Sequence, residues 1–433
     1  MSHFEKKHLV TASGYYQEKE LLRFSTIGSV DDGKSTLIGR LLYETNSIAD
    51  DQMLALEKAS INSGSDYLNL ALLTDGLTAE REQGITIDVA YRYFETKKRK
   101  FIIADCPGHV QYTRNMITGT SGVNTAVILV DARKGLQEQT LRHAFLSSLV
   151  QIKHLVLCVN KMDLVDFRED LFDNIKNEFY KYLSRLDIAD VQCIPISALN
   201  GDNVISRSNN MSWYQGVTLL YALENINLFS DPNLVDCRFP IQKVVRPLSE
   251  DYYDYRGYSG RVESGVLRVG DEVVVLPSGF SSKIKSIDSF DGQLEEAFYP
   301  MCVNVSIEDA LDISRGDMLV KPNNRATVSQ DVDLMICWLH KEPFDPKRKY
   351  LIKHTTREVQ CLVKEAGYKI NVNTLHREQI SDQNPIKMND IGRVQIRTNT
   401  PLLHDSYKKN KNTGCLIMID EFTHETIGAG LIL

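Results

Sequence analysis

The chain has 433 residues, of which 42% are hydrophobic and 25% are charged, and its net charge is −7. This globular composition excludes a mainly disordered chain, and the acidic balance argues against a strongly basic nucleic-acid-binding protein. The eight cysteines form no CxxC pair, so we expect neither a zinc ribbon nor a disulfide scaffold. No apolar run approaches the roughly 20 residues of a membrane helix, and the charged N-terminus is unlike a secretory signal. We therefore expect a cytoplasmic protein with no membrane contact.

The first half of the chain, residues 21–230, alternates short apolar segments with longer amphipathic ones. The pattern predicts strands over residues 22–27, 100–104, 126–131, 155–159 and 191–196. It predicts helices from residue 34 and over residues 112–118, 139–149, 170–183 and 216–223. Strands that alternate with helices are typical of an α/β domain with a mostly parallel sheet.

The second half, from about residue 235, is rich in short β-segments separated by glycine turns. Gly265 and Gly270 allow the positive φ that tight bends require, and Val262, Val266 and Val273 fit half-buried strands between the bends. We expect two small β-barrel domains here. The predicted domains are residues 1–235, 236–327 and 328–433.

A glycine-rich segment with the pattern GxxxxGKS lies between the first predicted strand and the first predicted helix. In that context, backbone amides curl around phosphate oxygens at the helix N-terminus, whereas the alternative is a plain turn with an exposed lysine. Lys34 is expected to reach the β- and γ-phosphates, and Ser35 is expected to ligate Mg²⁺. The predicted phosphate contacts are Gly28, Ser29, Val30, Asp31, Asp32, Gly33, Lys34, Ser35 and Thr36.

Two later segments predict guanine as the base. The Asp163 carboxylate accepts hydrogen bonds from N1–H and the exocyclic amino group of guanine, whereas adenine offers neither donor there. Asn160 links the base to the phosphate loop, and the Lys161 stem lies over the purine. The backbone N–H groups of one short segment face guanine O6: Ser197, Ala198 and Leu199. Taken alone, NKxD is also compatible with a simple strand-end turn.

The segment Asp105–His109, which reads DCPGH, follows another predicted strand. Asp105 suits Mg²⁺ coordination through water, and the Gly108 N–H suits a bond to the γ-phosphate. His109 is the candidate for orienting the attacking water, although an isolated histidine is more often a packing residue. Cys106 is interpreted as a small buried spacer and not as a nucleophile, because no base is paired with it.

Residues 75–88 lie between the phosphate loop and Asp105 and carry a further candidate. Thr86 is expected to supply a second hydroxyl to Mg²⁺ and a backbone N–H to the γ-phosphate, so that the segment is released on hydrolysis. Glu80 and Glu82 are interpreted as solvated charges of this switch and not as an acid–base pair. The predicted catalytic residues are therefore Lys34, Thr86 and His109.

Two weaker features have simpler interpretations. The basic run at residues 97–100 is interpreted as a solvated hairpin turn between two strands. The run at residues 252–256 mixes tyrosines with charges and is interpreted as a loop at a domain or subunit interface.

Together, the motifs GSVDDGKST, EREQGITID, DCPGH, NKMD and SAL, followed by two barrels, resemble the translation-factor superclass of GTPases. Residues 28–42, 75–77 with 79–94, and 99–105 resemble more closely the large, GTP-hydrolysing subunit of bacterial sulfate adenylyltransferase. Ser29 stands where elongation factors usually carry histidine, and those factors lack the continuation Ala90–Phe94.

The resemblance implies GTP and Mg²⁺ as cofactors and a role in sulfate assimilation. It also implies a complex with a small catalytic subunit, which condenses ATP and sulfate to adenylyl sulfate and pyrophosphate while GTP hydrolysis drives the step. By the same resemblance, Val30 and Ile85 are apolar gate residues that hold His109 away until activation. The single GxxxxGKS motif leads us to expect no fused adenylyl-sulfate kinase.

Two other functions are compatible with parts of the sequence. One is a GTP-dependent carrier of aminoacyl-tRNA, against which Ser29 and the switch sequence argue. The other is a P-loop kinase, which Asp163 and the paired switch segments disfavour. Nucleic acid is not an expected partner.

Overall fold

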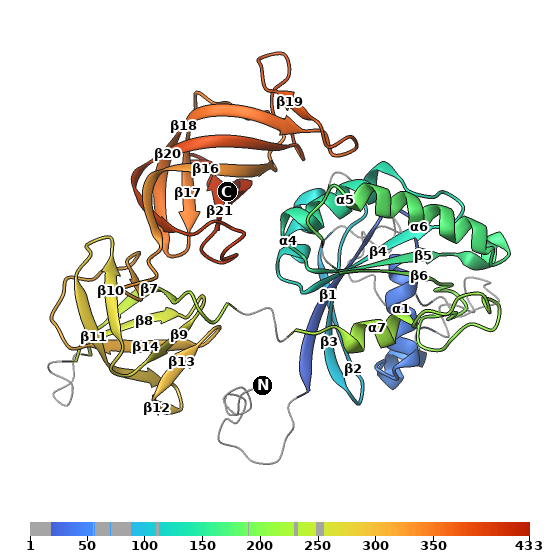
Figure 1. Ribbon diagram of the computed structural model, residues 1–433, viewed down its shortest axis with the longest axis horizontal. Coiled ribbons are helices and arrows are strands. Elements are labelled where there is room, and N and C mark those ends of the chain that lie inside the picture. The colour runs from blue at the N-terminus through green and yellow to red at the C-terminus, as the bar shows by residue number, and fades with distance from the viewer. Residues whose placement is uncertain are drawn as a thin grey trace. The chain divides into compact units, whose positions relative to one another are not determined.

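The computed structural model describes residues 19–54, 56, 70, 88–109, 112–188, 190–228, 233–247 and 255–433, without the side chains of 113 and 114. The chain forms two compact units, Met1–Leu228 and Phe229–Leu433. The first unit is built around one sheet with helices on both of its faces, and the second is built from β-strands (Figure 1).

The sheet of the first unit has six strands in the order β2-β3-β1-β4-β5-β6. The neighbours β3-β1-β4-β5-β6 pair in parallel, and the edge strand β2 pairs antiparallel with β3. This confirms the predicted α/β domain with a mostly parallel sheet. The strands are β1 Glu20–Gly28, β2 Ala90–Glu95, β3 Arg99–Asp105, β4 Thr125–Asp131, β5 His154–Asn160 and β6 Asp190–Pro195.

Helices cover the sheet, with α4, α5 and α6 on one side and α1 and α7 on the other (Figure 1). They are α1 Lys34–Glu44, α4 Thr113–Ser121, α5 Glu138–Leu149, the 3-10 helix η3 Met162–Val165, α6 Glu169–Leu183 and α7 Leu219–Asn225. The predicted start of α7 at residue 216 is wrong. The helix begins after Thr218, whose side chain accepts a hydrogen bond from the Tyr221 N–H and caps the first turn.

The core beneath α1 and α7 contains three aromatic rings from three neighbouring strands. Phe94 and Phe101 stack with ring centroids 4.5 Å apart, and each meets Phe24 edge-on at 6.4 Å. Arg99 faces this same side and is only 5% exposed, with its guanidinium donating to the Leu223 carbonyl and to Glu20. Lys97 and Lys98 lie in the hairpin turn as predicted, but Arg99 and Lys100 begin β3, and the description of the run as solvated is wrong for Arg99.

The second unit contains two seven-stranded sheets, each closed by an additional pairing, β10–β11 in the first and β17–β18 in the second. This closure confirms the two predicted barrels. The first barrel region has β7 Arg238–Val245, β8 Gly257–Arg261, β9 Val266–Arg268, β10 Glu272–Leu276, β11 Ser281–Ser289, β12 Gly292–Leu294, β13 Glu296–Phe298, β14 Cys302–Ile307 and β15 Met318–Val320. The second has β16 Thr327–Trp338, β17 Lys349–His354, β18 Arg357–Ile370, β19 Arg377–Gln379, β20 Ile391–His404, β21 Cys415–Ile419 and β22 Thr426–Ile432.

The glycine bends of the first barrel are present as expected. Gly265 and Gly270 have φ of 76° and 85°, values that favour glycine. Val262 and Val273 are completely buried in the barrel core. A closed barrel surrounds its inward-facing side chains on all sides, which an open sheet does not.

A buried ion pair joins the two barrels. Arg238 on β7 is 0% exposed, and its Nε and Nη2 donate to the two carboxylate oxygens of Asp405 at 2.7 and 2.8 Å. The same guanidinium donates to the carbonyls of Cys237 and Asn324, both at 2.8 Å. Burial would raise the pKa of Asp405, but the hydrogen bond and the charge of Arg238 outweigh it and lower that pKa. The pair is thus fully hydrogen-bonded, as a buried pair must be to persist.

All eight cysteines are unpaired. In the part of the chain that the structure describes, no helix combines the length and apolar character needed to cross a membrane.

Candidate nucleotide-binding site

The phosphate loop occupies the turn between β1, which ends at Gly28, and α1, which begins at Lys34. Gly33 has φ of 95°, and a Cβ at this position would stand 2.4 Å from Asn160 Nδ2. Both the backbone conformation and the contact therefore require glycine at residue 33. The loop is held in its curled shape with its amides at the N-terminus of α1, where anions bind.

Lys34 lies under this loop and is only 7% exposed. Its Nζ donates to the carbonyls of Ser29 at 2.8 Å and Gly28 at 3.2 Å. Burial lowers the pKa of Lys34, and the negative charges of Asp105 and Asp32 oppose that shift. A Cβ on Gly108 would stand 2.6 Å from Lys34 Nζ, so the DCPGH segment lies directly against the lysine.

Asp32 shapes the loop from inside, a role that the motif alone did not indicate. Its carboxylate is 1% exposed and accepts a hydrogen bond from the Ser29 N–H at 2.7 Å. Burial raises the pKa of Asp32, and the nearby Lys34 ammonium opposes the shift. Among the described residues, Asp32 Oδ1 and Ser29 Oγ are buried without a hydrogen-bond partner. These unused polar atoms belong to a loop suited to a polar ligand.

The candidate magnesium ligands that the structure describes are Asp105 and Ser35. Asp105 ends β3 with 1% exposure, and its Oδ1 accepts a hydrogen bond from Thr26 Oγ1 at 3.2 Å. Ser35 lies in the first turn of α1, next to Lys34. Carboxylate and hydroxyl oxygens are the hard donors that Mg²⁺ prefers, so the described part of the set fits that ion. Thr86, Ile85, Glu80 and Glu82 lie outside the described residues.

His109 and Cys106 flank the Gly108 contact with Lys34. His109 is half-buried, and its ring meets Tyr112 edge-on with centroids 6.1 Å apart. Cys106 is 0% exposed, and burial raises the pKa of its thiol to about 12. This agrees with the interpretation of Cys106 as a buried spacer, because a reactive cysteine must ionise.

Asn160, at the end of β5, ties the predicted phosphate and base regions together. It is 2% exposed, its Nδ2 donates to the Asp32 carbonyl at 2.8 Å, and its Oδ1 accepts from the Ala198 N–H at 2.9 Å. Asp163 lies just beyond, half-buried, with its Oδ1 buried and without a partner in the described chain. A shielded carboxylate oxygen left open in this way suits a ligand that donates hydrogen bonds.

The segment Ser197–Leu199 offers fewer amides than the sequence suggested. The Ser197 N–H donates to the Asp202 carbonyl at 3.2 Å, and the Ala198 N–H donates to Asn160. Of the three, only the Leu199 N–H makes no recorded hydrogen bond within the described residues. We therefore narrow the predicted contact with guanine O6 to the amide of Leu199.

Two residues that sequence reasoning missed hold this end of the site. Arg40 on α1 donates from Nε to the Ala198 carbonyl at 3.1 Å and from Nη2 to the Leu199 carbonyl. Asp131 is 0% exposed, ends β4, and pairs with Lys161 Nζ at 3.0 Å. Burial would raise the pKa of Asp131, but hydrogen bonds from Arg133 and Lys161 hold it well below its usual range. In the sequence, Asp131 could have been identified because it directly follows the apolar run 126–130, whereas no local pattern marked Arg40.

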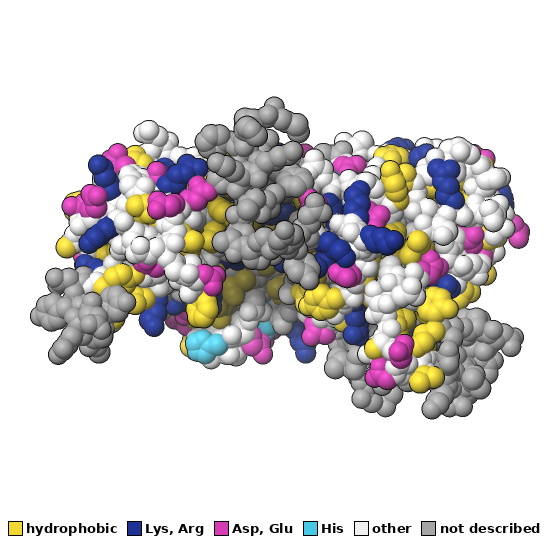
Figure 2. Space-filling model, turned by 90° about the horizontal axis from the view of Figure 1, so that it is seen from below, with side chains coloured by type: hydrophobic (Ala, Val, Ile, Leu, Met, Phe, Trp, Pro, Cys, Tyr) yellow, Lys and Arg dark blue, Asp and Glu magenta, His cyan; other side chains and the backbone are white. Residues whose placement is uncertain are grey.

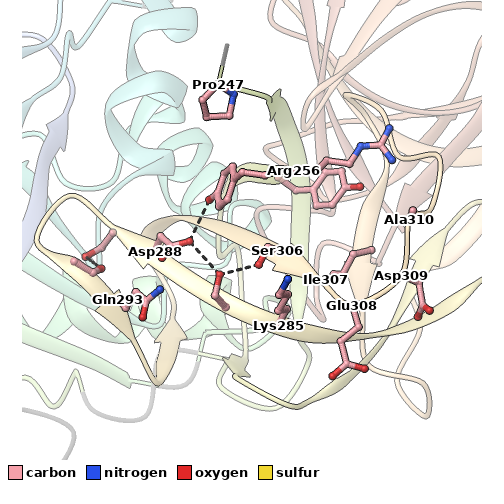
Figure 3. A pocket seen from close by; sticks show the side chains of 15 residues that line it. Pro247, Arg256, Lys285, Asp288, Gln293, Ser306, Ile307, Glu308, Asp309 and Ala310 are labelled. Carbon is pink, nitrogen blue, oxygen red and sulfur yellow. Dashed lines mark hydrogen bonds between the residues drawn. The ribbon is translucent and has the colours of Figure 1, made fainter. Parts of the chain in front are cut away.

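A separate cavity of about 1080 Å³ opens on the first barrel. Figure 3 shows its polar groups bonded to one another: Tyr255 Oη and Ser286 Oγ both donate to Asp288 Oδ2 at 3.1 Å, and Ser286 Oγ lies 2.7 Å from Ser306 Oγ. Lys285, Gln293, Glu308 and Asp309 also line the cavity. Tyr255 and Arg256 belong to the predicted interface loop, whereas residues 252–254 lie outside the described residues.

The surface charge is mixed. On the face seen in Figure 2, basic and acidic side chains are interspersed with apolar ones and form no single-sign patch. Within the described ranges, no group of three or more His, Cys, Asp or Glu side chains is placed to hold a metal ion. The residues around Lys34 and Asn160 are therefore the candidate site that the geometry supports.

Comparison with protein families divides the chain in the same order as the fold. Residues 19–236 match the Elongation factor Tu GTP binding domain, residues 258–320 match Elongation factor Tu domain 2, and residues 331–433 match the GTP-eEF1A C-terminal domain-like family.

Curated relatives match over nearly the whole chain. The Bifunctional enzyme CysN/CysC of Mycobacterium tuberculosis is 53% identical over 95% of this chain and 67% of its own length. Sulfate adenylyltransferase subunit 1 of Bacteroides thetaiotaomicron is 50% identical over 96% of this chain and 87% of its own length. The protein of the same name from Pseudoalteromonas atlantica is 48% identical over 96% and 88%.

Proposed function

Because this chain belongs to the sulfate adenylyltransferase subunit 1 family, we propose that it is the GTP-hydrolysing subunit of a sulfate adenylyltransferase. Its partner is the small catalytic subunit, which makes adenylyl sulfate and pyrophosphate from ATP and sulfate. The observation that carries the proposal is the pair of hydrogen bonds made by the Asn160 side chain. They connect the phosphate loop to the segment Ser197–Leu199, next to the Asp163 carboxylate, whose Oδ1 has no partner in the described chain. The relatives do not favour a carrier of aminoacyl-tRNA, because relatives named sulfate adenylyltransferase subunit 1 match nearly the whole of this chain.

Guanine selection rests on Asp163 and Leu199. The Asp163 carboxylate accepts from N1–H and the amino group of the base, and the Leu199 amide donates to O6. Adenine offers no such donors and would leave the half-buried carboxylate unpaired, which is costly. Lys161, held by Asp131, places its aliphatic stem over the purine face.

Phosphate binding and hydrolysis rest on the loop and on the DCPGH segment. The amides of residues 29–36 surround the phosphates, and the Lys34 ammonium neutralises β- and γ-phosphate charge. The hydroxyls of Ser35 and Thr86, and Asp105 through water, would hold Mg²⁺, which when bound supplies further charge neutralisation. His109 orients the water that attacks the γ-phosphate, while Val30 and Ile85 restrict its approach until activation.

Coupling between the two reactions requires the partner to distinguish the GTP-bound and GDP-bound states. A partner with equal affinity for both states does not change the equilibrium between them, however tightly it binds. The segments that respond to the γ-phosphate are Glu80–Asp88 and Asp105–Val110. We place the complex in the cytoplasm, and the eight unpaired cysteines support a reducing compartment. We also retain the domain boundaries at residues 235–236 and 327–328 as part of the proposal.

The deciding experiment measures adenylyl sulfate and released phosphate together, with the chain alone, with the small subunit, and with a Thr86→Ala variant. We expect no adenylyl sulfate from the chain alone and a GTP-stimulated yield from the pair. The variant should form the complex but lose the stimulation, because the γ-phosphate contact is missing. Adenylyl sulfate made by the isolated chain, or full stimulation through Thr86→Ala, would refute the proposal.

A further inference from the structure

One face of the sheet in the first unit exposes large side chains at the β2 edge. Tyr91 and Tyr93 on β2 are 50% and 66% exposed, and Leu21 on β1 is 36% exposed. Alternate residues of the same strands, such as Phe94 and Phe101, are buried in the core on the opposite face. The exposed side chains therefore lie on the outer face of the β2-β3-β1 half of the sheet.

The strand register places these side chains next to one another. Tyr93 pairs with Ile102, and Ile102 pairs with Arg23, which forms one row across three strands. Lys100 pairs with Leu21 in the adjoining row. Residues two apart on a strand share a face, so the side chains form one continuous patch. We name it the tyrosine face and define it as Leu21, Arg23, Tyr91, Tyr93, Lys100 and Ile102.

The tyrosine face carries two positive side chains, Arg23 and Lys100, and Glu95 lies on the same face opposite Lys100. Arg23 and Lys100 are exposed, and neither has a recorded ion pair with the described residues. Glu95, the acidic residue beside the patch, is engaged by Lys19 Nζ at 3.4 Å. A complementary partner therefore presents carboxylates around an apolar centre.

The composition and position of the face are those of a protein interface. Tyrosine and arginine are enriched at interfaces and dominate their binding energy, because they bury large area while keeping a polar tip. Apolar and aromatic side chains gathered in this way mark an interaction site more often than scattered exposed ones do.

The strands beneath the face lead directly into the segments that we propose to respond to the γ-phosphate. β2 begins at Ala90, two residues after Asp88, and β3 ends at Asp105. We propose that the tyrosine face is the docking surface for an acidic, partly apolar surface of the small catalytic subunit. This inference rests on the proposed function and adds to it the surface through which the nucleotide state affects partner binding.

The first test is the double variant Tyr91→Ala/Tyr93→Ala, titrated against the purified small subunit with GTP present. We expect the Kd of the complex to rise about 100-fold or more, because truncated hot-spot tyrosines commonly have effects of that size. GTP affinity and intrinsic hydrolysis without the partner should not change, which also shows that the variant is folded. The matched control is Tyr180→Ala/Tyr221→Ala, whose tyrosines are 40% and 55% exposed on α6 and α7.

The second test concerns charge. Arg23→Glu should weaken the complex more at low salt than at high salt, because the acidic partner is then repelled and salt screens that repulsion. Equal affinity of the wild type and the tyrosine double variant for the small subunit would overturn the inference. A wild-type chain that does not bind the small subunit at all would instead refute the proposed function.

Discussion

Replacing Asn160 by alanine should weaken GTP and GDP binding together while hydrolysis of bound GTP continues. The Asn160 side chain connects two segments that are distant in sequence, through hydrogen bonds of 2.8 Å to the Asp32 carbonyl and 2.9 Å from the Ala198 N–H. Alanine removes both bonds, and the phosphate loop and the Ser197–Leu199 segment are then no longer held in register. Each must be ordered again when nucleotide binds, and that cost appears in the affinity.

The size of the effect follows from the two bonds. A buried hydrogen bond contributes about 0.5–1.5 kcal/mol net, so two contribute about 1–3 kcal/mol. At 1.4 kcal/mol per tenfold, the Kd for both nucleotides should rise about 5- to 140-fold. Because the loss applies equally to GTP and GDP, the ratio of their affinities should stay constant.

The control is Asn203→Ala in the same unit. Asn203 is also 2% exposed, its Nδ2 donates to the Pro195 carbonyl at 2.9 Å, and its Oδ1 accepts from the Ser208 N–H at 2.9 Å. Both variants should lose similar thermal stability, but only Asn160→Ala should lose nucleotide affinity in a fluorescent-nucleotide titration. If both variants lose affinity equally, the effect of Asn160 is general destabilisation, and the reasoning is refuted.

Four further changes test other parts of the structure. Asp163→Asn should reduce GTP affinity by orders of magnitude and increase binding of a xanthine nucleotide, which presents an oxygen where guanine has an amino group; unchanged GTP titration would remove guanine recognition from this motif. His109→Ala should leave GTP binding nearly intact and slow single-turnover hydrolysis, since the imidazole acts mainly in the transition state; an equal loss of binding would indicate a structural role. Asp405→Asn leaves the Arg238 guanidinium buried without a carboxylate, and the denaturation midpoint should report a loss of about 3–5 kcal/mol. Burial lowers the pKa of His143 from 6.5 to about 3. The stability of the wild type should therefore fall as pH drops from 6.5 toward 3, because in this range the unfolded chain binds a proton at His143 and the folded chain does not. His143→Gln should flatten that pH dependence, and an unchanged profile would contradict the assignment.

Local sequence patterns predicted the features that depend on neighbouring residues. The strand β1, the turn of residues 29–33 and the start of α1 at Lys34 follow one another within 25 residues of chain, Glu20–Glu44. Asn160 was recognisable because its motif directly follows an apolar strand. The family resemblance then identified the fold class and the sulfate adenylyltransferase lineage, which the relatives confirm.

The features that escaped prediction depend on contacts between distant parts of the chain. Arg40 reaches carbonyls 158 and 159 residues away, and no local pattern signals such a contact. Arg99 looked like a solvated base, but the β2–β3 register turns it toward Leu223. The amide of Ala198 was predicted to face the base and is instead taken by Asn160, because motifs name candidate groups without showing which are already occupied.

The Arg238–Asp405 pair also constrains where this chain can be truncated or recombined with a related protein. A fragment ending between the barrels would keep Arg238 in the wall of the first barrel with its carboxylate partner deleted, and a fragment holding the second barrel alone would keep a stranded Asp405. Either truncation opens the surface that the pair crosses and removes the buried hydrogen bonds between Arg238 and Asp405. The smallest transplantable module of the β-rich half is therefore the pair of barrels, and chimeras with other GTPases of this lineage should exchange both barrels at once.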